Sequence, residues 1–129
     1  MVSQHISRII GTSPQKVYDY VRNPFTLPLW AAGLATSTVT EDNGRYFAQA
    51  PFGRVQVRFV QTNSSGVLDH EVITENGATF YNPMRVIPHP QGSEIIFTVR
   101  QLEMSDEQFA ADCRAVAADL ETLAQLLER

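Results

Sequence analysis

The stretch MSDEQFAADCRAVAADLETLAQLLER, residues 104–129, has the apolar spacing of one long α-helix. Its apolar side chains recur at steps of three or four residues, at Phe109, Cys113, Val116, Leu120, Ala124 and Leu127. Ser105, followed by Gln108 three residues later, matches a capping box at the start of this helix. A single helix with one narrow apolar stripe has to bury that stripe against another element, and the preceding sequence supplies a sheet.

Most of the chain before this helix has the pattern of short strands separated by turn sequences such as Asp42-Asn43-Gly44. The predicted strands cover residues 2–10, 34–40, 45–50, 54–62, 67–74, 78–88 and 93–102. Because the connections after the second of these strands are short, we expect neighbouring strands to pair antiparallel.

Two short helices are expected between the first and second strands. Ser13-Pro14 is typical of an N-cap followed by a first helical residue, and Asn23-Pro24 ends that helix. Residues 24–34 have a second proline and an apolar segment around Trp30, which indicates another short helical turn.

The composition is that of an ordinary globular chain of 129 residues, which we interpret as a single domain, residues 1–129. The net charge is −4, and the ten lysines and arginines are scattered, which argues against a nucleic-acid-binding surface. No apolar run is long enough for a membrane span, and no signal sequence opens the chain, so we expect a cytoplasmic protein without a membrane partner. An edge strand leaves a homodimer possible.

The order of one strand, two short helices, six strands and a long helix resembles the helix-grip (SRPBCC) superfamily. This superfamily includes polyketide cyclases and dehydrases, START-related lipid-transfer domains and plant ligand carriers. The stretches Val21-Arg22-Asn23-Pro24, Leu29–Leu34, Gly66–His70 and Asn82–Val86 resemble its bacterial polyketide-cyclase-like branch. The resemblance implies an α+β fold in which a seven-stranded antiparallel sheet wraps around the C-terminal helix and leaves an apolar cavity.

Strand parity selects the side chains that face this cavity. Burying Asp69 and Glu71 without partners would be costly, so the opposite face of that strand, with His70, should point inward. The same reasoning turns Phe80, Asn82 and Met84 inward, although Pro83 requires an edge or a bulge, which could reverse the parity on one side.

His70 allows three interpretations. It is a core histidine bonded to a backbone carbonyl or to Asn82, it orients a ligand together with Asn82, or it acts as a general acid or base. Trp30 either anchors the core or closes the mouth of the cavity. Asp112 and Asp119 border the apolar stripe on one side of the helix; they are either solvated, or one of them pairs with an arginine of the sheet or lines the cavity.

The sequence therefore predicts a domain that binds a small hydrophobic or aromatic molecule between sheet and helix, as a carrier or sensor. The predicted ligand-binding residues are Trp30, Phe59, His70, Phe80, Asn82, Met84, Phe97, Phe109 and Val116. One alternative is an enzyme of the cyclase or dehydratase type that uses His70 for proton transfer. A second alternative is a packed interaction domain without a ligand. Neither a metal nor a cofactor is expected, because the histidines are far apart in sequence and no phosphate-binding loop occurs.

Overall fold

The predicted C-terminal helix is present as α3, Asp106–Leu127, in the computed structural model, which describes residues 1–129. The capping box is confirmed: the Ser105 hydroxyl accepts a hydrogen bond from the Gln108 N–H at 3.1 Å, and the Gln108 carboxamide accepts one from the Ser105 N–H at 3.0 Å. The residues that α3 buries are Cys113, Leu120, Leu123, Ala124 and Leu127. The apolar stripe read from the sequence therefore faces the interior.

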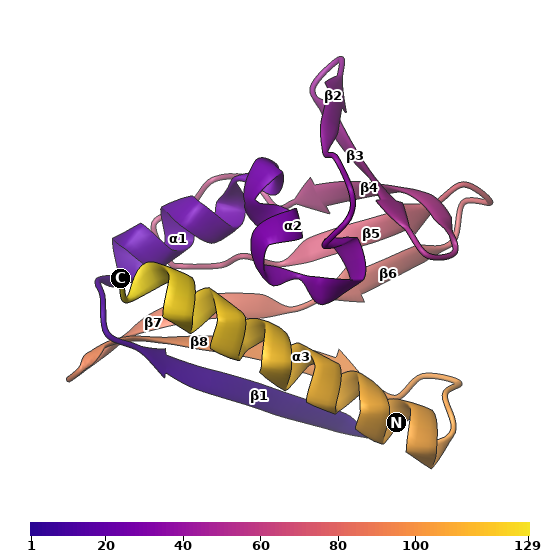
Figure 1. Ribbon diagram of the computed structural model, residues 1–129. Helices are drawn as coiled ribbons and strands as arrows, with labels where there is room; N and C mark the ends of the chain where they lie inside the picture. The colour runs from indigo at the N-terminus through magenta and orange to yellow at the C-terminus, as the bar shows by residue number, and fades with distance from the viewer.

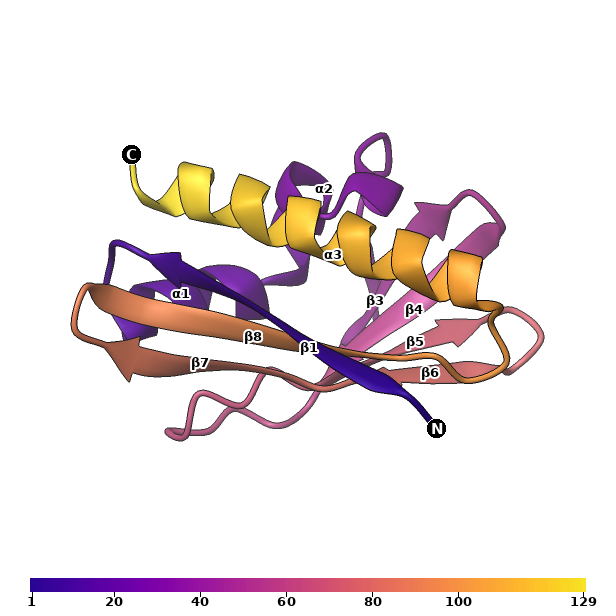
Figure 2. The same ribbon diagram turned by 90° about the horizontal axis from the view of Figure 1, so that it is seen from below.

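The elements follow the predicted order. After β1 (Ser3–Ile10) come the short helical segments α1 (Pro14–Arg22), η1 (Pro24–Thr26), α2 (Leu27–Trp30) and η2 (Ala32–Leu34). The remaining strands are β2 (Thr40–Asp42), β3 (Arg45–Ala50), β4 (Gly53–Phe59), β5 (His70–Thr74), β6 (Thr79–Asn82), β7 (Met84–His89) and β8 (Gly92–Arg100). All pairs are antiparallel, in one sheet of order β1-β8-β7 and one of order β2-β3-β4-β5-β6. Figures 1 and 2 show α3 running along β1 and β8, which confirms the α+β helix-grip architecture.

The strand boundaries differ from the expectation in three places. Eight strands are present instead of seven, because Pro83 divides the predicted strand 78–88 into β6 and β7. Of the predicted strand 34–40 only Thr40 is in a strand, because the last 3₁₀ turn ends at Leu34 and β2 begins at Thr40. The predicted strand 67–74 begins only at His70, and Val67 contributes a single isolated bridge to Arg85.

The segment from Gly66 to Leu68 joins the two sheets. The Val86 N–H donates to the Gly66 carbonyl at 2.9 Å, and the Leu68 N–H donates to the Met84 carbonyl at 2.8 Å. Thus the chain leading into β5, in the five-stranded sheet, is hydrogen-bonded to β7, in the three-stranded sheet. The strands together form the curved surface on which α3 packs.

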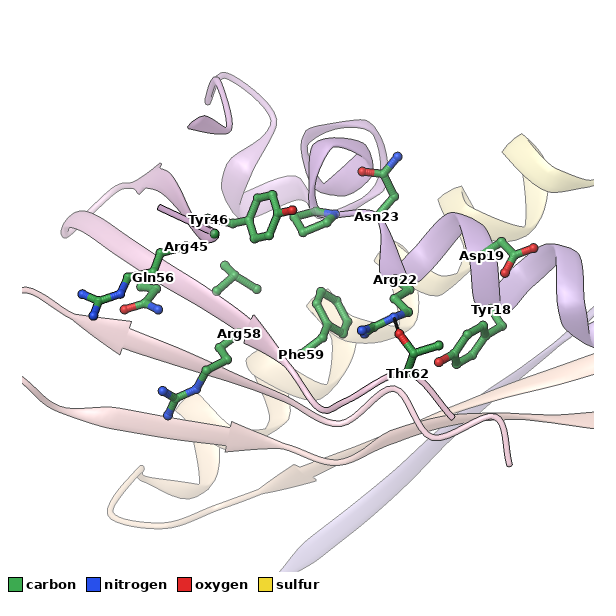
Figure 3. A pocket seen from close by; sticks show the side chains of 13 residues that line it. Tyr18, Asp19, Arg22, Asn23, Arg45, Tyr46, Gln56, Arg58, Phe59 and Thr62 are labelled. Carbon is green, nitrogen blue, oxygen red and sulfur yellow. Dashed lines mark hydrogen bonds between the residues drawn. The ribbon is translucent and has the colours of Figure 1, made fainter. Parts of the chain in front are cut away.

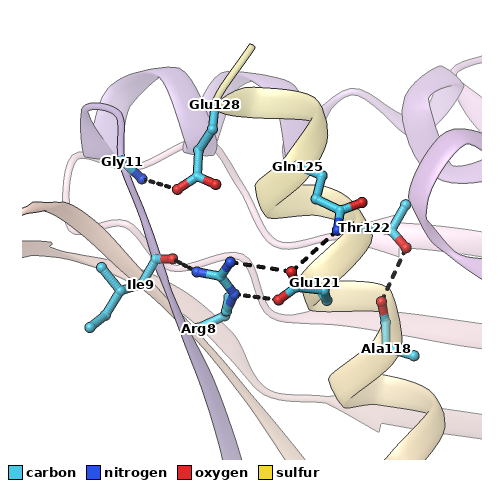
Figure 4. A network of polar contacts seen from close by, with 8 residues as sticks. All are labelled: Arg8, Ile9, Gly11, Ala118, Glu121, Thr122, Gln125 and Glu128. Atoms are coloured by element: carbon cyan, nitrogen blue, oxygen red, sulfur yellow. Dashed lines mark hydrogen bonds and ion pairs between the residues drawn. The ribbon is translucent and has the colours of Figure 1, made fainter.

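Polar contacts also fix the position of α3 relative to β1 (Figure 4). Arg8 of β1 donates to Glu121 of α3 with Nε–Oε2 at 2.6 Å, and the hydrogen bond lowers the pKa of the Glu121 carboxyl. The Gly11 N–H donates to the Glu128 carboxylate at 2.8 Å. Exposed ion pairs contribute little to stability, so burial of the apolar stripe holds the helix in place.

Candidate ligand-binding site

An apolar cavity of about 160 Å³ lies between strands of both sheets on one side and α2 and α3 on the other, and we call it the inner cavity. Nine of its eleven lining residues are hydrophobic, and the remaining two are His70 and Asp119. The full lining is Leu27, Trp30, Ala31, Leu34, Val57, His70, Val72, Phe97, Val116, Asp119 and Leu120. One wall comes from β4 and β5 of the five-stranded sheet and β8 of the three-stranded sheet, and the other comes from α2, η2 and α3.

His70 is a deeply buried polar residue of the inner cavity, at 7% exposure. Its register opposite Phe59 on β4 and Asn82 on β6 confirms that it shares the inner face of the sheet with them. Its ring lies 5.0 Å from the Phe59 ring and 5.9 Å from the Phe97 ring, measured between centroids.

The protonation of His70 follows from its surroundings. Its Nδ1 lies 3.0 Å from the Leu68 carbonyl, and since a carbonyl only accepts, Nδ1 carries the proton in the neutral ring. Burial lowers the pKa of His70, and this effect outweighs the opposing influence of the Leu68 carbonyl and the Asp69 charge. The ring is therefore neutral at pH 7, and its Nε2 is an acceptor without a partner in the protein.

Trp30 and Asp119 also line the inner cavity. Trp30 is 6% exposed, and its indole N–H is buried without a hydrogen-bond partner. Asp119 accepts a hydrogen bond from the Ala32 N–H at 3.1 Å, which ties α3 to the chain following α2. Burial raises the pKa of Asp119, with a further contribution from the Asp112 charge and an opposing one from the Ala32 N–H.

A second, more polar space of about 720 Å³ opens between the end of α1 and strands β3 and β4, and we call it the outer cleft (Figure 3). Its lining comprises Tyr18, Asp19, Arg22, Asn23, Pro24, Gly44, Arg45, Tyr46, Gln56, Val57, Arg58, Phe59 and Thr62. Only four of these thirteen residues are hydrophobic. Val57 lines both spaces, so the outer cleft adjoins the inner cavity.

The predicted ligand-binding residues fall into three groups. Trp30, His70, Phe97 and Val116 line the inner cavity, and Phe59 lines the outer cleft. Phe80, Asn82, Met84 and Phe109 line neither space, so for these four residues the prediction of a cavity wall is corrected. That any of the nine contacts a ligand stays a prediction.

Each of these four corrections has a physical reason. Phe80 pairs with Val72 and so points to the expected face, but it is 45% exposed, because β6 is the edge of its sheet and nothing covers it. Met84 is 2% exposed, because its side chain packs in the main hydrophobic core beside β8. Phe109 lies in the first turn of α3, away from the middle of the helix, where Val116 and Leu120 reach the inner cavity. Asn82 lies directly opposite His70, but the hydrogen bond of His70 goes to Leu68 instead.

The sequence interpretation missed Leu27, Val57 and Arg22. Val57 could have been predicted, because it lies two residues before Phe59 on β4 and therefore shares the inner face of this strand with it. The placement of Leu27 and Arg22 depends on how the α1–η1–α2 segment folds back over the sheet, which no periodicity in so short a segment specifies.

Comparison with solved structures identifies the same architecture in proteins of very different sequence. A Bacillus halodurans protein has 15% identity over 99% of this chain and 98% of its own, with a TM-score of 0.74. The Bacillus cereus protein XoxI has 19% identity over 98% and 96%, with a TM-score of 0.73. Ara h 8.0201 has 12% identity over 98% of this chain and 97% of its own, with a TM-score of 0.67.

At these identities the similarity establishes the fold alone. No family model matches the sequence, and a search of curated proteins found no match. No helix of the structure has both the length and the apolar character needed to cross a membrane. The resemblance read from the sequence is confirmed at the level of the fold: the chain has the helix-grip fold.

Proposed function

We propose that the protein binds a small hydrophobic or aromatic molecule in the inner cavity, as a carrier or sensor. The observation that carries this proposal is the cavity itself, an apolar space beside α3 with very few polar groups. Ligand sites in proteins have this composition, in which apolar walls provide affinity and a few polar atoms set orientation. The helix-grip fold is commonly a hydrophobic-ligand-binding fold, which supports the same function. An unfilled interior counts against the alternative of a packed interaction domain.

The size of the inner cavity limits the part of the ligand that it can hold. A volume of about 160 Å³ is close to that of engineered apolar cavities of about 150 Å³ that stay dry and bind benzene. It is below the range of about 300–1,000 Å³ for sites that enclose drug-sized molecules. We therefore propose that the inner cavity holds one aromatic ring or an aliphatic group of similar size.

One unpartnered polar atom defines a hydrogen bond that such a ligand would make. The neutral His70 ring offers Nε2 as an acceptor. A polar atom that is buried without a partner costs free energy, so a ligand hydroxyl that donated to it would gain affinity. This makes a phenol a suitable test ligand.

Val116→Trp is expected to block this site. Val116 lines the inner cavity from α3, and an indole at that position would occupy the space of the ligand ring. NMR titration of the parent with p-cresol should give saturable shifts at Val57, His70 and Phe97, and the variant should show none. Ala115→Trp, at the neighbouring exposed position, is the control and should bind like the parent. If the parent showed no saturable shift at these residues, or if Val116→Trp bound p-cresol normally, the proposal would be wrong.

The alternative enzymatic function also has a specific observation in its favour. His70 and Asp119 line the same cavity, and burial moves their pKa values in opposite directions, down for the imidazole and up for the carboxyl. A neutral imidazole at the wall of an apolar cavity can act as a general base, which proton transfer at an enolisable carbon requires. Under this alternative His70 Nε2 removes the proton and returns it, or a solvent deuteron, to the same carbon.

His70→Gln separates the two functions. In a binding protein this substitution should weaken the binding of p-cresol by about 1–2 kcal/mol, the scale of one buried hydrogen bond. In an enzyme it should also slow proton exchange at the α-carbons of a bound ketone by about 10²–10⁴-fold. Phenylacetone in D₂O provides the assay, with deuterium incorporation followed by NMR. We expect no exchange above the buffer rate in the parent, and protein-catalysed exchange that disappeared in His70→Gln would favour the enzyme.

A further inference from the structure

The outer cleft and the inner cavity come close to each other at Val57 and Phe59. Phe59 lines the outer cleft, its ring is 5.0 Å from that of His70 in the inner cavity, and the neighbouring inward residue of β4, Val57, lines both spaces. Phe59 is only partly buried, so it is accessible from the outer cleft. The two spaces are therefore adjacent, and a molecule that occupied both would have its ring in the inner cavity and its other end in the outer cleft.

The outer cleft is positively charged although the protein has a net charge of −4. Its lining contains Arg22, Arg45 and Arg58 and only one carboxylate, Asp19, which accepts a hydrogen bond from Gln15. Arg58 forms an ion pair with Glu71 at 2.8 Å. In Figure 3 the guanidinium groups of Arg45 and Arg58 point away from Phe59, whereas that of Arg22 is directed toward it.

Arg22 has the features of an anion-binding group. Its Nε donates to the Thr62 hydroxyl at 2.8 Å and its Nη1 donates to the Val60 carbonyl at 2.9 Å, so the guanidinium is held in place by neutral oxygens alone. No carboxylate of the protein pairs with it. Its Nη2 makes no hydrogen bond within the protein, and a guanidinium fixed in this way can donate to a carboxylate with little further loss of side-chain entropy.

We infer that the ligand is an amphipathic acid, with its apolar group in the inner cavity and its carboxylate bound by Arg22 in the outer cleft. This inference rests on the proposed function, because it requires the apolar group to occupy the inner cavity. It adds that the ligand carries a negative charge and that Arg22 provides the selectivity for it. Neutral molecules of the same shape should bind through the apolar group alone.

A matched pair of probes tests this inference: 4-phenylbutyrate and 4-phenylbutan-1-ol, which differ in charge but share the ring and chain. At pH 7.5 and low salt, the parent should bind the acid about tenfold more tightly than the alcohol, the scale of one charge-assisted hydrogen bond. Arg22→Gln should remove this preference and leave the affinity for the alcohol unchanged, and Arg22→Lys should restore part of it. Arg114→Gln, an exposed position on α3, controls for the loss of one positive charge.

The possible results separate the inference from the proposed function. Equal affinities for the two probes in the parent, or a loss for both probes in Arg22→Gln with the melting temperature unchanged, would overturn the inference and leave the cavity proposal standing. If the acid bound in a way that required Arg22 but was not blocked by Val116→Trp, the proposed function would be overturned, and with it the placement of the apolar group. Binding of neither probe would overturn both. A preference for the acid that is lost in Arg22→Gln and kept in Arg114→Gln supports the inference.

Discussion

Leu120→Asp is expected to prevent stable folding. Leu120 is 1% exposed in the middle of α3, where it belongs to the main core cluster and lines the inner cavity. An aspartate there would place an unpaired charge in apolar surroundings at a cost of several kcal/mol, against a total stability of about 5–15 kcal/mol for a typical domain. Circular dichroism and thermal denaturation of the purified variant measure the effect.

Ala117→Asp is the matched control for this substitution. Ala117 is exposed and lies one turn before Leu120 on the same helix. Its replacement introduces the same charge at the cost of helix propensity alone, about 0.7 kcal/mol. A Leu120→Asp protein that melted within a few degrees of the Ala117→Asp protein would show that α3 does not bury this face.

Among the replacements of a glycine by alanine, Gly66→Ala is expected to lower the stability of the protein most. A Cβ at position 66 would lie 2.1 Å from the Val86 carbonyl oxygen, and the backbone has a φ of +71°, which L-residues rarely adopt. The Gly66 carbonyl accepts from the Val86 N–H, so moving it would weaken the junction between the two sheets. We expect a loss of about 3 kcal/mol or more in the free energy of unfolding.

Gly77→Ala separates the two causes of this loss. Gly77 has a φ of +87°, but a Cβ there would meet no atom within 4 Å. Its replacement should therefore cost only the conformational penalty of about 1–2 kcal/mol. Urea denaturation of both variants gives the comparison, and equal losses at the two positions would contradict the close approach of Gly66 to β7.

The long helix and the inward face of the strands could be predicted because both depend on simple periodicity. The stripe from Phe109 to Leu127 fixed which side of α3 is buried, and the cost of burying Asp69 and Glu71 oriented His70 correctly. The parity also held across Pro83, since Met84 and Val86 are buried and Arg85 is exposed. At this position the sheet is interrupted, but the alternation of the side chains is not.

The parity of a strand does not determine how far along it the cavity extends. Phe80 and Met84 have the predicted orientation, yet one lies at an uncovered edge and the other in solid packing. The difference depends on where α2 and α3 cover the sheet, which is a property of the tertiary structure. The prediction of a strand at residues 34–40 was wrong for a related reason. The segment after η2 has threonines typical of a strand, but it has no partner strand until Thr40.

The polar groups of the site were only partly accessible to sequence reasoning. His70 could be chosen because it is a lone histidine between apolar inward residues. Arg22, by contrast, is one of several scattered arginines, and only the fold brings it beside Thr62 and Val60 at the mouth of the outer cleft. Long-range contacts of this kind leave no local pattern in the sequence.

The central claim is that the space between the sheet and α3 accepts the apolar part of a ligand. Intermolecular nuclear Overhauser effects between the ring protons of bound p-cresol and the methyl groups of the protein test it most directly. The structure predicts contacts to Val57, Val116 and Leu120, which face the inner cavity from the sheet and from α3. Contacts confined to exposed side chains such as Leu29, with none to these three residues, would contradict the claim.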